Sequence, residues 1–514
     1  MNGTGLKAVV TSSSISQAVE PHLVRNALFN SSSWCAMVLV NLVAIPLFIR
    51  YLGVEGYGIY LLLTGLFGYF GLLDFGLSDS VVKYVAHHQE LGDHESVAES
   101  VNAALLVQVF GGVVGVSVLC AFNHQIIRAL HVSSALAHVA SIGLYVSAVG
   151  FFCKMLLNTY NAALKGMQRF DIFAKTTAGY SVATAVTAVL VLIAGGGLLE
   201  VIVVTALMTV ANLATVLLLV SRYIPRYRVA LRVRQEPFRA LFGFGAYTFI
   251  TRIAGALNTY FLQVIIAVIL GASAVAYFAV PLRLTTAMEA GLSSLVGVIF
   301  PYVSGLNARG NLESLRRLYS HASKYVVALS APPYLFVILF SHQILRIWLG
   351  PSFAEKGWLV LSFLGSSSLL AIWTMVPANT VFGTGNPKIT AVFSSIVAGL
   401  NLLFSIFLTI KLGITGTAAA VLISAAQGPI FIWYVTSRVV GISPRKYFAR
   451  VFGFHIAPTL GFFLLSLMIS WVTRGEGAPA SWVALALGTA LTGLYYSLLL
   501  GLRFISFHDL GWSG

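Results

Sequence analysis

The tripeptide Asp74-Phe75-Gly76 is the first feature of this sequence that could carry chemistry. In a protein kinase it holds the magnesium of ATP, together with a glycine-rich loop, a strand lysine and an HRD catalytic segment. The sequence contains no HRD segment, and neither GFGAY (243–247) nor GTGNPK (383–388) fits the glycine-rich pattern. We therefore expect Asp74 to cap a helix or to act as a gate. No catalytic residue, metal site or cofactor is predicted.

Three other ionisable residues, Lys154, Arg252 and Glu289, lie inside long apolar segments. Charges are costly in hydrocarbon, so each is a functional candidate by default. Arginine offers an anion a bidentate fork and lysine a point charge, while amides and hydroxyls suit sugar hydroxyls. Together they predict a hydrated cationic cavity. The expected polar partners, several of them at helical spacing from these charges, are Asn158, Asn161, Asn41, Thr259 and Gln263.

A second interpretation of these charges is structural. Lys154 or Arg252 could pair with Glu289 or Asp74 and so hold helices together. Glu289 could equally serve a coupling cation or neutralise an arginine. Arg283 lies near the end of its apolar segment, so we expect it to extend to the membrane interface.

The composition indicates that these apolar segments lie in a lipid bilayer. Of 514 residues, 58% are hydrophobic and only 9% are charged, whereas a soluble domain carries about 25% charged residues. About fourteen apolar segments are long enough to cross ~30 Å of hydrocarbon as helices, the favoured spanning element in lipid. We therefore predict an all-α integral membrane protein.

The net charge of +15 reflects membrane topology, and we expect no nucleic-acid partner. Lysine and arginine accumulate in cytoplasmic loops. If the N-terminus is cytoplasmic, most of the 31 basic residues lie on the cytoplasmic side. An even number of spans then places both termini there. The strongest contribution comes from the loop that carries Arg222, Arg226, Arg228, Arg232, Arg234 and Arg239.

Similar segments recur in the same order six spans apart, which predicts two six-helix lobes of the same orientation plus two extra helices. The expected organisation is a cytoplasmic tail (1–28), an N-lobe (29–220), a basic loop (221–241), a C-lobe (242–437) and a C-terminal segment with two helices (438–514). The recurring pairs are RNALF (25–29) with FRALF (238–242), YLGVEGYGIY (51–60) with ILGASAVAYF (269–278), GLS (76–78) with GLS (291–293), and GMQR (166–169) with GNPK (385–388).

Four stretches together resemble the bacterial polysaccharide flippases of the multidrug, oligosaccharidyl-lipid and polysaccharide exporter superfamily. The resemblance covers essentially the whole chain and is most specific in the first stretch. The four are LGVEGYGIYLLLTGLFGYFGLLDFGLSDSVVKYVA (52–86), GMQRF (166–170), FGTGNPK (382–388) and LGITGTAAAVLIS (412–424).

The resemblance implies a transporter, not an enzyme, that moves undecaprenyl-pyrophosphate-linked oligosaccharide between the leaflets of the bacterial cytoplasmic (inner) membrane by alternating access. Membrane lipids, a polysaccharide polymerase and a co-polymerase are the other implied partners. By analogy with lipid II flippases, the two extra helices would hold the polyprenyl tail. The alternatives are a multidrug or other small-molecule exporter of this superfamily, and a membrane glycosyltransferase such as an O-antigen polymerase or ligase. Against the latter, the outside loop 122–139 carries no acidic residue.

Overall fold

The computed structural model describes residues 21–69, 77–224, 261–297, 299–473 and 477–501, and within them every regular element is a helix. Ten helical stretches of this part of the chain are long and apolar enough to cross a membrane. The predicted all-α membrane fold is therefore confirmed, and the count of about fourteen spans stays a prediction. Asp74, Arg252 and Thr259 lie outside the described residues.

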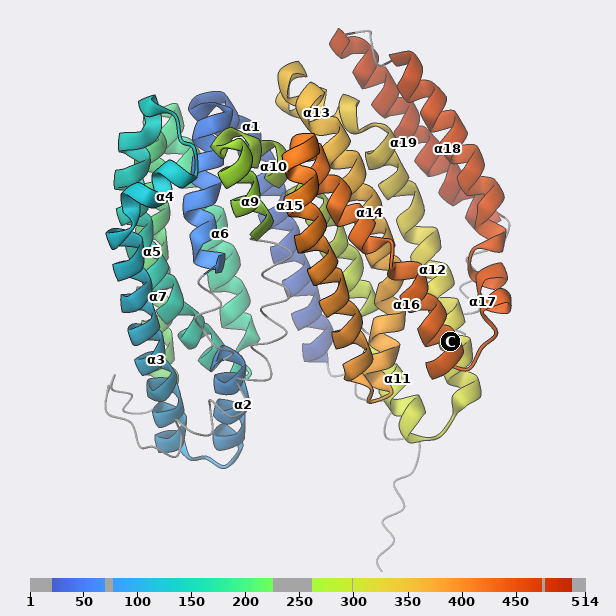
Figure 1. Ribbon diagram of the computed structural model, residues 1–514. Helices are drawn as coiled ribbons and strands as arrows, with labels where there is room; N and C mark the ends of the chain where they lie inside the picture. Colours follow the sequence, from blue (N-terminus) through green and yellow to red (C-terminus); the bar gives the residue numbers. More distant parts are fainter. Residues whose placement is uncertain (1–20, 70–76, 225–260, 298, 474–476, 502–514) are drawn as a thin grey trace, which may run out of the picture.

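The helices form two bundles that stand side by side (Figure 1). We call α1 to α7 the first bundle and α9 to α17 the second. The first comprises α1 (Pro21–Tyr69), α2 (Leu77–Glu90), α3 (His94–Ala121), α4 (Asn123–Ala129), α5 (Ser134–Gly166), α6 (Phe170–Ile193) and α7 (Leu198–Tyr223).

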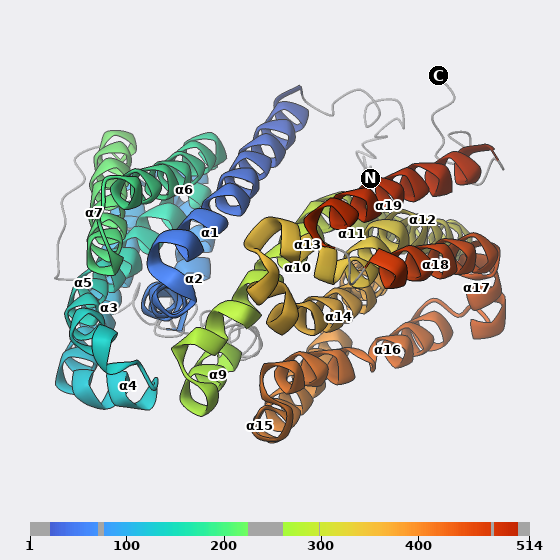
Figure 2. The same cartoon turned by 90° about the horizontal axis from the view of Figure 1, so that it is seen from above.

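The second bundle follows the same order of long and short helices. It comprises α9 (Leu262–Leu270), α10 (Ala272–Val296), α11 (Ile299–Ala308), α12 (Leu312–Leu339), α13 (Ser341–Leu349), α14 (Pro351–Gly383), α15 (Pro387–Ala425), α16 (Gly428–Tyr434), a π-helical turn (Val435–Val439) and α17 (Pro444–Val451). The last two helices, α18 (Gly453–Thr473) and α19 (Gly477–Gly501), contact α12 and α13 on the outer flank of this bundle (Figure 2).

Two glycines at positive φ break the chain direction at equivalent places in the two bundles. Gly53 interrupts α1 with φ 71° and ψ 170°, and Gly271 separates α9 from α10 with φ 89° and ψ 168°. Glycine has no Cβ to oppose this backbone conformation. The sequence pairing of 51–60 with 269–278 is thus confirmed in backbone geometry.

The helix starts and ends repeat at the same separation along the chain. Asp93 caps α3 by accepting a hydrogen bond from Ser96 N at 3.0 Å, and Asn311 caps α12 by accepting one from Ser314 N at 3.0 Å. Such caps satisfy amides that the helix itself leaves unpaired. Further equivalent pairs are Gly92 with Gly310, both at positive φ, and Phe122 with Phe340, both next to a short helix.

This register corrects two of the sequence pairings. The separation of the two GLS segments along the chain is three residues shorter than that of the pairs above. The turn after α5 aligns Gln168 (φ 58°) with Gly385 (φ 77°), a separation one residue shorter than that of the pairs above and two residues shorter than that of GMQR with GNPK. The parallel duplication itself holds, because the elements recur in the same order.

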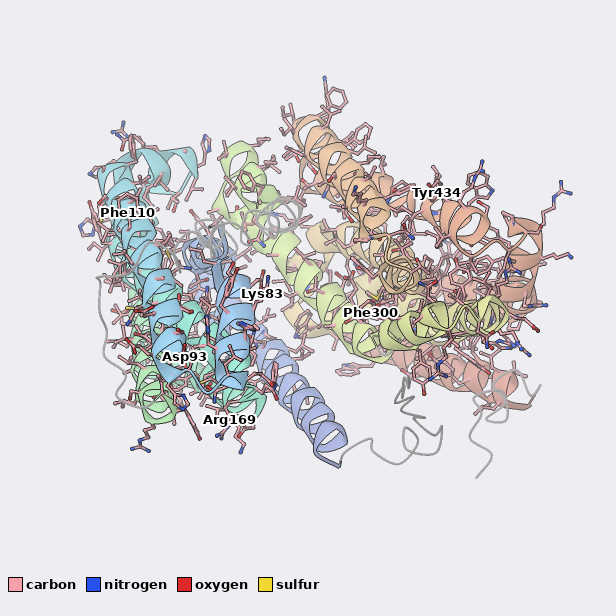
Figure 3. All side chains as sticks on the ribbon, turned by 90° about the horizontal axis from the view of Figure 1, so that it is seen from below. Lys83, Asp93, Phe110, Arg169, Phe300 and Tyr434 are labelled. Carbon is pink, nitrogen blue, oxygen red and sulfur yellow. The ribbon has the colours of Figure 1, made fainter. Side chains whose placement is uncertain are left out.

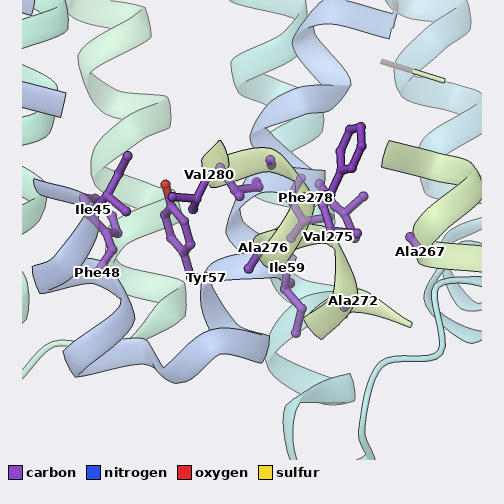
Figure 4. Close-up of a cluster of buried hydrophobic side chains, with 14 of the residues drawn as sticks. Ile45, Phe48, Tyr57, Ile59, Ala267, Ala272, Val275, Ala276, Phe278 and Val280 are labelled. Carbon is purple, nitrogen blue, oxygen red and sulfur yellow. The ribbon is translucent and has the colours of Figure 1, made fainter. Parts of the chain in front are cut away.

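The bundles meet through α1 and α10 at the end of the molecule that carries Gly53 and Gly271. Tyr57 and Ile59 of α1 lie against the start of α10 in a shared apolar cluster (Figure 4). Trp348 of α13 adds a polar link by donating from Nε1 to the Leu42 carbonyl oxygen at 3.0 Å. Seen from below, Lys83, Asp93 and Arg169 lie on the first bundle, and Phe300 and Tyr434 on the second (Figure 3).

We expect Gly58→Ala to loosen this contact. A Cβ on Gly58 would meet the carbonyl group of Ala272, a backbone group that cannot rotate away. Overpacking of this kind costs about 1–3 kcal/mol. Thermal unfolding of the purified protein should show a lower midpoint for Gly58→Ala. The control is Gly399→Ala, because its Cβ would enter open space, and an equal midpoint for both variants would contradict the close approach.

Candidate functional site

A polar cavity of about 330 Å³ lies inside the first bundle, between α1, α5, α6 and α7, with one side chain added from α10. Ligand sites usually combine such a concave volume with a few convergent polar groups. The polar residues that line it are Asn41, Tyr57, Tyr60, Thr64, Lys154, Asn161, Thr177, Tyr180, Ser181, Thr184, Thr205, Thr209, Asn212 and Arg283.

The cavity is cationic. Lys154 of α5 makes no hydrogen bond or ion pair with any residue that the structure describes. Arg283 of α10 donates from Nη1 to the hydroxyl of Tyr57 at 3.1 Å. None of the described lining residues is acidic, so both positive charges remain available to an anion. The expected interfacial role of Arg283 is wrong, because its side chain lines this cavity.

The threonines of α6 and α7 present acceptors to the cavity. Thr184 Oγ1 donates to Tyr180 O at 2.6 Å, and Thr205 Oγ1 donates to Val201 O at 2.9 Å. A hydroxyl that donates to its own helix still has free lone pairs. The cavity therefore combines two cationic donor groups with a wall rich in oxygen acceptors.

Two amide oxygens extend this acceptor surface. Asn161 Oδ1 and Asn212 Oδ1 are buried without a hydrogen-bond partner among the described residues. Leaving a buried polar atom unsatisfied costs about 1–3 kcal/mol. A ligand that brings hydroxyl groups into the cavity would remove this cost, as a sugar does.

Aromatic rings form the wall on α1. The ring centroids of Phe48 and Tyr60 lie 5.1 Å apart in a stacked arrangement, and those of Phe48 and Tyr57 lie 5.7 Å apart. Tyr57 is fully buried and also belongs to the contact between the bundles. The cavity wall and the bundle contact thus share a side chain.

The helix α5 is positioned by a contact within the first bundle. Glu55, just after the Gly53 break of α1, accepts a hydrogen bond at 2.8 Å from the backbone amide of Ser133, the residue that precedes α5. An acceptor at a helix start satisfies an amide that the helix leaves unpaired. Glu55 therefore ties the start of the helix that carries Lys154 to α1.

The structure brings together three of the predicted cavity residues, Lys154, Asn161 and Asn41. Asn158 of α5 and Gln263 of α9 are half-buried but do not line the cavity. The other predicted members, Arg252 and Thr259, lie outside the described residues, as does the gate candidate Asp74.

Glu289 lies apart from these residues, on α10 in the second bundle. Its carboxyl group lies near Ser368 of α14 and Tyr334 of α12. An ion pair between Lys154 and Glu289, one of the structural alternatives, is not formed in this structure. Glu289 therefore belongs to a separate polar position.

The sequence interpretation missed the hydroxyl-rich faces of α6 and α7. A signal was present, because polar residues recur at helical spacing in otherwise apolar segments. On α6 they are Thr177, Tyr180, Ser181 and Thr184, and on α7 they are Thr205, Thr209 and Asn212.

The second bundle has a counterpart cavity of about 250 Å³ between α14, α15 and α16. By the register that Gln168 and Gly385 define, Ala371 occupies the position of Lys154, and Ala378 that of Asn161. None of the described residues that line this cavity is charged. The two bundles share a backbone plan, but among the described lining residues only the cavity of the first bundle contains charged side chains.

Comparison with known proteins agrees with this architecture. A Shigella flexneri protein with a provisional name as an O-antigen transporter is 22% identical over 429 residues, covering 82% of this chain and 99% of that protein. A Haloferax volcanii protein, provisionally named as a flippase of low-salt glycan biosynthesis, is 22% identical over 204 residues, covering 40% of this chain and 43% of its own.

Solved structures show the same fold. The lipid II flippase MurJ in an inward closed conformation matches with a TM-score of 0.74 and 13% identity, over 92% of this chain and 98% of that one. An inward-facing multidrug resistance MATE transporter matches with a TM-score of 0.62 and 17% identity, over 79% of this chain and 97% of that one. The family model described as "Polysaccharide biosynthesis protein" matches residues 23–307, more than half of the chain. The chain therefore belongs to this family of multi-pass membrane proteins of polysaccharide biosynthesis.

Proposed function

We propose that this protein flips polyprenyl-pyrophosphate-linked oligosaccharide across the cytoplasmic membrane by alternating access, as a transporter and not as an enzyme. The observation that carries the proposal is the cationic cavity, which is free of acidic lining residues among those described. The family match and the names of the relatives support the same substrate class. They favour it over the multidrug exporter that the shared fold would also accommodate.

The chemistry of the cavity suits both parts of such a head group. A pyrophosphate carries only acceptor oxygens, which match the ammonium of Lys154 and the guanidinium of Arg283. Sugar hydroxyls can donate to the amide oxygens of Asn161 and Asn212 and to the threonine oxygens. Arg252 remains a proposed third cation.

The proposed orientation places both termini in the cytoplasm, in line with the preference of lysine and arginine for that side. The bundle contact at Gly53 and Gly271 then closes the outer side, and the head group would enter from the cytoplasmic side. Rocking of the bundles would break the α1–α10 contact and release it outward.

Other assignments extend the proposal. We take 1–28 as a tail, 29–220 and 242–437 as the lobes, 221–241 as their linker and 438–514 as the extra helical segment. Glu289 and Asp74 are candidates for coupling or gating. Glu289 fits such a role because it is acidic and lies within a helix near the polar groups of Ser368 and Tyr334. A polymerase and a co-polymerase are the proposed protein partners.

We expect Lys154→Gln to reduce export of polysaccharide about tenfold or more. A hydrogen bond to a charged group contributes about 1.5–3 kcal/mol, and glutamine keeps most of the volume. The measurement is surface polysaccharide together with the lipid-linked oligosaccharide that accumulates in the inner leaflet. Lys175→Gln is the control, because Lys175 is exposed on α6 and does not line the cavity. Normal export by Lys154→Gln at normal protein level would refute the head-group site.

The pair Arg283 and Tyr57 predicts a graded series. Arg283→Ala removes a cation and should lose most export. Tyr57→Phe keeps the cation and removes only its hydrogen-bond acceptor, a loss of about 0.5–1.5 kcal/mol. Its transport rate should fall only a few-fold. Arg128→Ala, an exposed arginine on α4, should behave as wild type. An equal loss in both cavity variants would show that Tyr57 acts by more than orienting Arg283.

A further inference from the structure

An apolar groove of about 340 Å³ runs between α1 and α6 on the flank of the first bundle. Every residue that lines it is an alanine, valine or leucine. Several of these side chains are exposed, among them Val43 at 69%, Leu39 at 63% and Leu190 at 58%. In a membrane protein such a groove contacts hydrocarbon and accepts an apolar chain without penalty.

The groove adjoins the cationic cavity. Ala44 of α1 and Ala185 of α6 line both of them. On the inner side of this pair are Asn41 and Lys154, and on the outer side are Val43 and Val186. The boundary between the polar and the apolar compartments is therefore formed in part by two methyl groups.

We propose that the groove holds the first isoprene units of the substrate's polyprenyl chain while its pyrophosphate lies in the cavity. This inference rests on the proposed function and adds a lipid-tail site to it. The charge and polarity of the two compartments match one amphipathic molecule, with an anionic hydroxylated head and a branched hydrocarbon tail.

This location differs from the one that analogy suggests. The two extra helices, α18 and α19, contact α12 and α13 and lie on the far flank of the second bundle (Figures 1 and 2). A head group bound at Lys154 has the α1–α6 groove as its adjoining apolar surface. The part of the tail next to the pyrophosphate therefore leaves the protein through the first bundle.

The experiment fills the groove from its lipid-exposed side. Val43→Trp and Val186→Trp place bulk at positions that are 69% and 46% exposed, so neither disturbs a buried core. Leu207→Trp on α7, 60% exposed and outside the groove, is the matched control. Binding of two probes, undecaprenyl pyrophosphate and inorganic pyrophosphate, is measured on the purified protein in nanodiscs.

We expect each groove variant to bind undecaprenyl pyrophosphate about tenfold or more weakly, because apolar contact area is lost. Binding of inorganic pyrophosphate should stay unchanged, since this probe has no apolar part and reaches only the cavity. Lys154→Gln should weaken the binding of both probes. Thermal unfolding of the groove variants should match that of Leu207→Trp, which shows that the fold is intact.

Two results would separate the failure of this inference from that of the proposed function. If the groove variants bind undecaprenyl pyrophosphate as wild type does, while Lys154→Gln weakens both probes, the tail lies elsewhere and the head-group site stands. If Lys154→Gln weakens neither probe, the proposed head-group site is wrong and the tail site fails with it. Displacement of undecaprenyl pyrophosphate by an equimolar amount of phosphatidylglycerol would also overturn the inference, because the groove would then be a general lipid slot.

Discussion

The absence of hydrogen-bond partners in hydrocarbon is the constraint on which the structure depends. It makes the backbone helical throughout the described spans, and it drives polar side chains into the interior of a bundle. Threonines of α6 and α7 donate to carbonyl groups of their own helices, so their polarity is tolerated between apolar neighbours. Lys154 lines the same cavity as these threonines.

The duplicated backbone carries unequal chemistry. Helix starts, positive-φ glycines and short connecting helices recur between the bundles at a separation that varies by one residue. The cavities do not follow this symmetry, since Lys154 has an alanine at the equivalent position and the second cavity is smaller and neutral. Backbone turns are determined by a few glycines and caps, which both copies retain, whereas the lining side chains can change without altering a turn.

Most of the fold could be predicted from the sequence, but only part of the candidate site could. The helical class and the duplication could be predicted because they rest on local signals. These are the length of the apolar segments, the charge of the loops, and the Leu-Gly dipeptides that end at Gly53 and Gly271. Lys154, Asn161 and Asn41 were also predictable, because isolated polar residues stand out in apolar helices. Arg283 was misplaced, since its distance from a helix end says nothing about its hydrogen bond to Tyr57. That contact depends on how α10 packs against α1, which no local pattern reports.

One turn of α1 faces several environments in succession. Asn41 lines the cavity, the Leu42 carbonyl accepts the hydrogen bond of Trp348 from the other bundle, Val43 lines the groove, and Ala44 borders both compartments. Occupancy of the cavity, filling of the groove and docking of the bundles therefore all involve one helical turn, and any coupling between their free energies is reciprocal. A ligand that displaces this turn changes the stability of the bundle contact by as much as that contact changes the ligand's affinity. These four consecutive residues would then be enough to link substrate binding to a change in the contact between the bundles.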